Sequence, residues 1–224
     1  MSYRNVVVKK PWGKEYLIYE NDNLGIWFLH IEEGQSTSMH CHPKKNTGLV
    51  VLDGFAEVSF LKNKISLKGV DKIMVFRGRF HSTTALSKGG AFILEVESPK
   101  DKHDLVRLHD KYGREKKSYE SKKYESPKDE NCMWFEDPVD KIKNTYNFCN
   151  CEIVIENIEN IDQVRDRTYD EAIIVLSGGL ISKNNDPIVQ KGDVIAGHTI
   201  NKLSSYFDLH PHTTLLSIKK ERNT

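Results

Sequence analysis

Three histidines are the residues whose types and spacing point most clearly to chemistry. His40 and His42 are one residue apart, and residues two positions apart on a β-strand project from the same face. His81 follows the turn-forming residues Gly78-Arg79-Phe80, from which it can fold back over the pair. Three neutral imidazoles can hold one divalent metal ion and leave positions open for water or substrate. The pattern therefore predicts a metal site, and the alternative is a group of exposed polar side chains on loops.

The sequence around these histidines predicts β-structure. Short runs rich in β-branched residues alternate with turns that contain Gly, Asn or Asp, a pattern typical of antiparallel sandwiches and barrels. The runs in the first hundred residues are Ile26–Ile31, Thr47–Leu52, Ala56–Leu61, Lys72–Phe76 and Ala91–Val96. A second series consists of Cys151–Ile155, Glu171–Leu176, Gly179–Ser182, Val194–Ala196 and Thr214–Ile218. The two series share an order of parts that indicates a weak internal repeat.

A charge-dense stretch separates the two series. Residues 115–148 are predicted to be a charged linker and connecting segment, with Glu115 to Glu130 exposed. Just before it, Val106 to Tyr112 could form a short helix that ends at Gly113. The expected organisation is a metal-bearing domain at residues 1–114, the connecting segment, and a β domain at residues 149–224.

The histidine spacing resembles the two sequence motifs of the cupin superfamily. The matching residues are Gly34, His40, His42 and Gly54 in the first motif and Gly69, Gly78 and His81 in the second. Thr47 stands where the first motif has Glu, and Phe76 stands where the second has Pro. Over roughly residues 8–114 the chain is also similar to the C-terminal cupin domain of type II phosphomannose isomerase/mannose-1-phosphate guanylyltransferase enzymes. The segments that carry this likeness are Lys10–Gly13, Phe92–Glu97 and Asp104–Arg114.

The resemblance implies an all-β cupin barrel (a double-stranded β-helix, or jelly roll). It also predicts a bicupin with a degenerate second barrel, in which Arg165 and Arg167 stand in place of the His-x-His pair. The implied cofactor is one divalent transition metal, Zn, Fe, Ni or Mn, on His40, His42 and His81. The implied function is isomerisation or epimerisation of a sugar phosphate or nucleotide sugar in carbohydrate biosynthesis. The alternatives are a three-histidine Fe(II) oxygenase and a non-catalytic sugar-binding cupin.

Further residues are candidates for catalysis and substrate binding. Glu95 and Lys45 are the candidate catalytic groups, and either Glu57 or Glu95 could supply the carboxylate that is missing at position 47. Lys44 and Lys45 follow the histidine pair and could also meet a phosphate. Arg77 and Arg79 flank the second motif and are predicted to bind substrate at the mouth of the barrel.

The composition narrows the expected partners and location. Lys plus Arg total 33 and Asp plus Glu total 32, so the net charge of +1 argues against a nucleic-acid partner. No apolar run approaches the roughly 20 residues of a membrane helix, and the first residues do not resemble a signal peptide. The protein is therefore expected in the cytoplasm, with its four cysteines reduced and Cys149 and Cys151 as buried apolar residues. The expected partners are a small anionic or sugar substrate and a second copy, in a homodimer formed through β edges or the outer barrel face.

Overall fold

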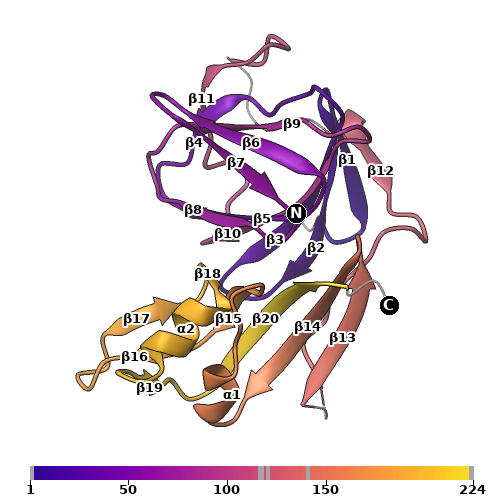
Figure 1. Ribbon diagram of the computed structural model, residues 1–224. Helices are drawn as coiled ribbons and strands as arrows, with labels where there is room; N and C mark the ends of the chain where they lie inside the picture. Colours follow the sequence, from indigo (N-terminus) through magenta and orange to yellow (C-terminus); the bar gives the residue numbers. More distant parts are fainter. Residues whose placement is uncertain (1–2, 116–118, 120–121, 140–141, 222–224) are drawn as a thin grey trace.

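The computed structural model describes residues 3–115, 119, 122–139 and 142–221, and these residues form two β-rich units (Figure 1). The first unit contains the strands up to β12, and the second runs from β13 to β20. Within the described residues, no helix is long and apolar enough to cross a membrane. The four cysteines are free thiols.

The first unit consists of two antiparallel sheets that enclose a barrel interior. The strands of the seven-stranded sheet, in spatial order, are β12 (Glu125–Pro127), β1 (Val6–Lys10), β2 (Gly13–Glu20), β3 (Gly25–Ile31), β10 (Ala91–Ser98), β5 (Asn46–Asp53) and β8 (Lys72–Val75). Those of the opposing five-stranded sheet are β11 (Val106–His109), β4 (Met39–Cys41), β9 (His81–Ala85), β6 (Phe55–Phe60) and β7 (Lys64–Lys68). We call these sheets A and B.

The second unit repeats this two-sheet plan on a smaller scale. Sheet C contains β13 (Lys143–Phe148), β14 (Cys151–Ile158), β20 (Thr213–Lys220), β15 (Ala172–Ser177) and β18 (Val194–Ala196). Sheet D contains β17 (Pro187–Gln190), β16 (Gly179–Ile181) and β19 (Asp208–Leu209). Two short helices, α1 (Asp162–Arg165) and α2 (Gly197–Leu203), lie beside these strands, and a 3₁₀ turn (Lys122–Tyr124) precedes β12. The prediction of a mostly β protein with two β-rich halves is confirmed.

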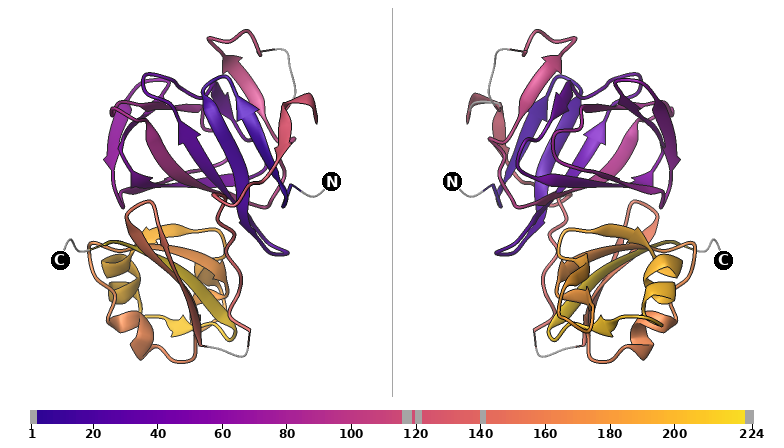
Figure 2. Two further views of the ribbon diagram at one scale, coloured as in Figure 1. Left: turned by 90° about the vertical axis from the view of Figure 1, so that its right-hand side faces the viewer. Right: turned by 90° about the vertical axis from the view of Figure 1, so that its left-hand side faces the viewer.

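Sheet A is buried on both faces, and this explains its continuous apolar strands. In β5, Leu49 and Val51 point into the barrel interior, whereas Val50 and Leu52 join a core that also contains side chains of sheet C. Sheet C packs against the outer face of sheet A, and both views in Figure 2 show the first unit directly above the second. The approach is close at Gly48, where a Cβ atom would lie 2.2 Å from Val194 Cγ2.

Two expectations about the middle of the chain need correction. Val106–His109 forms β11, an edge strand paired with β4, and not the start of a helix. The pairing satisfies its backbone groups, and the sequence Val-Arg-Leu-His alternates as a half-exposed strand does. The predicted connecting segment also contributes to both units, because β12 pairs with β1, β13 pairs with β14, and Phe135 is fully buried in the shared core. Of the stretch predicted to be exposed, residues 116–118 and 120–121 lie outside the described residues.

Candidate metal centre

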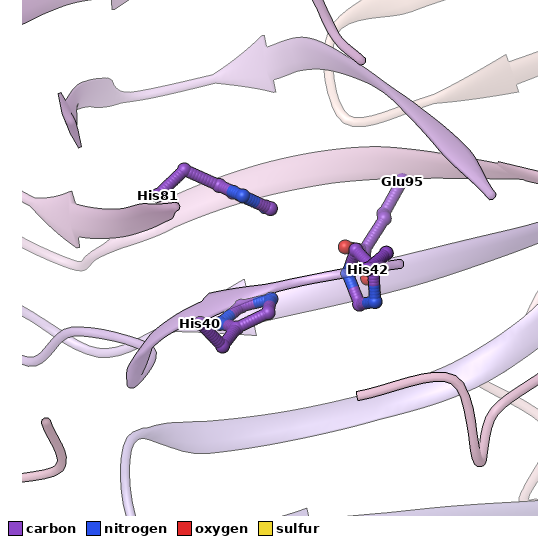
Figure 3. A group of neighbouring side chains, drawn as sticks. All are labelled: His40, His42, His81 and Glu95. Carbon is purple, nitrogen blue, oxygen red and sulfur yellow. The ribbon is translucent and has the colours of Figure 1, made fainter. Parts of the chain in front are cut away.

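Four side chains, carried by β4, β9 and β10 and by the residue after β4, converge inside the first barrel. His40 lies on β4, His42 directly follows β4, His81 begins β9, and Glu95 lies on β10. Each offers one ligand atom, and these atoms all lie within 4.8 Å of one another. Figure 3 shows the three imidazoles and the carboxylate turned toward a common space. The i, i+2 spacing and the β4–β9 pairing, in which His40 is opposite His81, produce this convergence.

Main-chain carbonyl groups fix the orientation of all three rings. The Nδ1–H groups of His40, His42 and His81 donate to the carbonyl oxygens of Ser38 (2.7 Å), Asp104 (2.6 Å) and Arg79 (3.1 Å). A carbonyl oxygen can only accept, so each ring carries its proton on Nδ1 and leaves the Nε2 lone pair available. Metal-binding histidines are held in this way by partners around the ligand shell.

The environment keeps these imidazoles neutral. All three are buried, with 8%, 6% and 2% of His40, His42 and His81 exposed. Burial lowers the pKa of His42 to about 3, assisted by Lys45, and burial lowers the pKa of His81 to about 4. Burial, followed by the other two histidines, holds the pKa of His40 well below its usual range. Neutral imidazoles are the form that binds a metal ion.

The donor set fits a divalent transition metal. His42 Nε2 is buried and has no hydrogen-bond partner among the described residues, which is the state expected of a ligand atom. Imidazole nitrogens combined with one carboxylate suit Zn, Fe, Ni or Mn. The histidines predicted from the sequence therefore lie together in an arrangement that can hold such an ion.

Glu95 places a carboxylate beside the histidines, whereas position 47 has Thr. Thr47 is fully buried on β5, where its backbone pairs with Glu97 of β10. Glu95 lies on that same neighbouring strand, and alternation along β10 turns it toward the histidines. Glu57, the other carboxylate considered, instead accepts a bond from Lys64 Nζ at 2.7 Å on β6 and β7. Of the two carboxylates considered, Glu95 is therefore the one that lies at the histidines.

A buried ionic network surrounds the cluster. Lys102 Nζ lies 3.0 Å from Glu97, 3.4 Å from Glu15 and 3.9 Å from Glu95, while Lys45 Nζ lies 2.8 Å from Glu97. Burial raises the pKa of Glu95, and the nearby Glu97 and Glu15 raise it further against the opposing Lys102. Burial opposes ionisation of Glu97 too, but the charges of Lys102 and Lys45 outweigh it and lower its pKa. Two carboxylates on one strand therefore have pKa values shifted in opposite directions.

The cluster opens into a cavity of about 60 Å³. One water molecule needs roughly 10–15 Å³ by the same measure, so the space suits an ion with a few small ligands. Lys45, a candidate catalytic residue, lines this cavity and is 1% exposed. Arg77 and Arg79 do not line it. Both are exposed in the β8–β9 loop, where the Arg79 guanidinium lies 3.9 Å from the centre of the Phe60 ring.

Several charged residues of the cavity were absent from the predicted site. They are Lys10, Glu15, Glu97, Lys102, Arg107 and Arg114. Glu97 could have been found from the sequence, because Glu95 and Glu97 occupy alternate positions of an otherwise apolar strand and so must share a face. Lys102 and Arg114 lie in irregular segments, and no local pattern marks them.

The second unit has a fixed ion pair near the position predicted from the repeat. Arg167 donates to Glu171 at 2.8 Å and to Glu156 at 2.6 Å, and Glu171 is fully buried. Arg165, by contrast, makes an exposed pair with Asp162. No histidine takes part in these contacts.

Comparisons with known proteins bear on the first unit. Residues 2–110 match the family model described as mannose-6-phosphate isomerase C-terminal. No curated protein matches the chain. Among solved structures, KdgF from Halomonas sp. is 18% identical, with 41% of this chain and 84% of that chain covered and a TM-score of 0.39.

Two other solved structures are similar to the same degree. A protein with a double-stranded β-helix domain from Klebsiella pneumoniae subsp. pneumoniae is 18% identical, with 43% and 79% of the two chains covered and a TM-score of 0.40. A cupin-2 domain containing protein from Shewanella frigidimarina is 16% identical, with 38% and 79% covered and a TM-score of 0.34. Residues 2–110, just under half of the chain, thus form a two-sheet antiparallel barrel and match the mannose-6-phosphate isomerase C-terminal family.

Proposed function

We propose that this protein is a metal-dependent cupin that isomerises or epimerises a sugar phosphate or nucleotide sugar in carbohydrate biosynthesis. The observation that carries the proposal is the convergence of His40, His42, His81 and Glu95 in a buried cavity, with all three Nδ1–H groups donated to carbonyl oxygens. The match to an isomerase-associated domain family supports the class of substrate. The free thiols support a reducing compartment, so we keep the cytoplasm as the proposed location.

The chain's own residues suggest how the reaction would be assisted. A bound divalent ion would supply Lewis-acid polarisation of sugar oxygens. Glu95 would hold or move a proton at its carboxylate, because burial favours its protonated form and a pKa near the working pH suits acid–base catalysis. Lys45 Nζ donates to Glu97 and to the carbonyl oxygen of Asp101, and its third N–H can donate to a substrate oxygen. The small cavity would admit only the reacting end of a sugar.

Metal analysis of protein purified without chelator tests the proposal. We expect about one equivalent of Zn, Ni or Mn in the native protein and a loss of metal in the His42→Ala variant, whose fold should be retained. Iron accompanied by oxygen uptake would favour the three-histidine oxygenase, and no metal at all would favour a sugar-binding protein.

A second variant distinguishes whether Glu95 is a metal ligand or the group that carries the proton. If Glu95 is a ligand, Glu95→Gln should lose metal. If it carries the proton, Glu95→Gln should keep metal and lose the exchange of substrate hydrogen with deuterated solvent, measured by NMR on a panel of sugar phosphates. Glu57→Gln, on the opposite sheet, is the matched control and should change neither property.

A further inference from the structure

We propose that three adjoining loops at one end of the first barrel bind the surface of an anionic membrane. They are residues 43–45, between β4 and β5, residues 61–63, between β6 and β7, and residues 76–80, between β8 and β9. We call them the rim loops. Their exposed side chains do not line the histidine cavity, so the proposal does not depend on the function proposed above.

Backbone and ring contacts hold the rim loops beside one another. The N–H of Gly78, in the middle of the β8–β9 loop, donates to the carbonyl oxygen of His42 at 2.8 Å, just before the β4–β5 loop. On the other side, the last residue of β6 pairs with the first residue of β9. The Arg79 guanidinium also lies over the Phe60 ring, 3.9 Å from its centre. The β8–β9 loop therefore lies between the other two and contacts the strands from which both extend.

The rim loops concentrate positive charge. Their exposed cationic side chains are Lys44, Lys62, Arg77 and Arg79. None of the three loops contains Asp or Glu, although the chain as a whole has a net charge of only +1. Among the described residues, no carboxylate forms a salt bridge with these four side chains. Asp104, which is buried, accepts the backbone N–H of Lys44 and not its ammonium group. The surface of the rim loops is therefore cationic.

Apolar side chains stand directly beside these charges. Leu61 is 62% exposed and precedes Lys62 in the β6–β7 turn. Phe76 is 60% exposed and precedes Arg77 in the β8–β9 loop. Exposed apolar groups edged by charged residues are typical of protein and membrane interaction sites. The same pairing of an apolar residue with a cation thus occurs on two adjacent loops.

This pairing favours a membrane over other partners. An anionic bilayer carries phosphates at the level of its headgroups and an apolar layer directly beneath them, so both kinds of side chain find a favourable environment at once. A nucleic acid offers the phosphates but no apolar layer for Leu61. A second copy of the chain would bring the same four cations into a twofold contact, where they repel one another. The rim loops therefore fit an anionic leaflet, on which the protein lies without spanning it.

Co-sedimentation with lipid vesicles tests the proposal. The native protein should bind vesicles made of equal parts of phosphatidylglycerol and phosphatidylcholine, and should bind pure phosphatidylcholine at least about tenfold more weakly. The double variant Arg77→Gln/Arg79→Gln should bind the anionic vesicles about 10- to 30-fold more weakly, because each cation near such a surface contributes several-fold. Phe76→Ser should bind them about tenfold more weakly through lost apolar burial, and this loss should persist in about 0.5 M salt, which screens the charges.

Matched changes on the second unit provide the control. Arg165→Gln and Tyr206→Ser replace an exposed arginine and an exposed aromatic residue, and each should stay within about twofold of native binding.

Four results would overturn the proposal. They are a native protein that does not bind anionic vesicles, equal binding to neutral vesicles, an equal loss in the control variants, and native binding in the rim-loop variants. If the native protein binds a DNA duplex but no vesicles, the first of these results holds and the rim loops belong to a nucleic-acid site. Circular dichroism of every variant separates lost binding from lost folding. Should Phe76→Ser fail to fold, Leu61→Ser takes its place with the same expected loss.

Discussion

Asp104 lies 62 residues after His42 in the sequence and bonds both to His42 and to the backbone that follows it. Its removal should therefore weaken both the fold and the metal site. Its carboxylate Oδ2 accepts the backbone N–H groups of Lys44 (2.9 Å) and Lys45 (3.0 Å), and its carbonyl oxygen accepts Nδ1–H of His42 (2.6 Å). Asp104 is only 6% exposed, so an alanine would leave the donor of Lys45 buried without a partner. Hydrogen bonds to a charged group contribute about 1.5 to 3 kcal/mol each, and we expect a loss of about 3 kcal/mol in the free energy of unfolding.

The Asp104→Ala substitution should also lower metal affinity, because Asp104 orients His42. A backbone shift at position 104 would misplace the carbonyl that orients the ring, and loss of such an outer partner typically lowers metal affinity about 10- to 100-fold. Urea unfolding of the metal-free protein and calorimetric zinc titration measure the two effects separately. Asp104→Asn, which keeps one acceptor oxygen, should lose about half as much stability.

A nearby aspartate provides the control. The Asp101 side chain accepts only an exposed N–H, that of His103, among the described contacts. Asp101→Ala should therefore change stability by less than about 1 kcal/mol. If Asp104→Ala matches Asp101→Ala in both stability and zinc affinity, Asp104 does not hold the cluster in place.

Three further predictions concern the fold and assembly. Gly48→Ala should cost about 1 to 3 kcal/mol, because its Cβ would press on the buried Val194, and chemical unfolding should remain a single transition across both units. Burial opposes ionisation of Asp110, but its bonds with Arg114 outweigh this and lower its pKa, so the pair's contribution should be present above about pH 4 and lost below it. The free energies of unfolding of Asp110→Asn and of the native protein, measured from pH 7 to pH 3, should converge in acid. The predicted homodimer should give twice 25.8 kDa by light scattering.

The histidine site was predictable because its determinants are local. Strand periodicity puts His40 and His42 on one face, and a turn after β8 returns the chain to place His81 opposite His40. Arg77 and Arg79 were predicted on the same reasoning of proximity in sequence. The loop instead exposes them, and Arg107 enters the cavity from a strand that is distant in sequence.

What covers the outer face of sheet A could not be read from its strands. Val50, Leu52, Leu94 and Val96 face sheet C, but an apolar run such as Leu49–Leu52 predicts only that both faces are covered, without identifying what covers them. This packing also restricts the homodimer. With the outer face of sheet A occupied by the second unit, the predicted association must use a strand edge or the outer face of sheet B.

Thr47 and Glu95 together offer a test of how the cluster acquires its carboxylate. The two residues lie on the paired strands β5 and β10, where Thr47 is opposite Glu97 and therefore diagonal to Glu95. Diagonal neighbours on one face are within reach of long side chains, so a glutamate at position 47 could direct its carboxylate toward the same histidines. Thr47→Glu alone would crowd a third carboxylate beside Glu95 and Glu97 in a cavity of about 60 Å³, and we expect it to destabilise the protein by about 1 to 3 kcal/mol. In the Glu95→Gln background the like-charge contact with position 95 is removed while that with Glu97 remains, and the added glutamate should restore zinc affinity lost by Glu95→Gln to within about tenfold of native. Calorimetric titration of the two single variants and the double variant gives the coupling between the positions. If the double variant binds zinc no better than Glu95→Gln, then either the carboxylate of position 95 is not a ligand or position 47 cannot reach the histidines. A Glu95→Gln variant that keeps native zinc affinity identifies the first case.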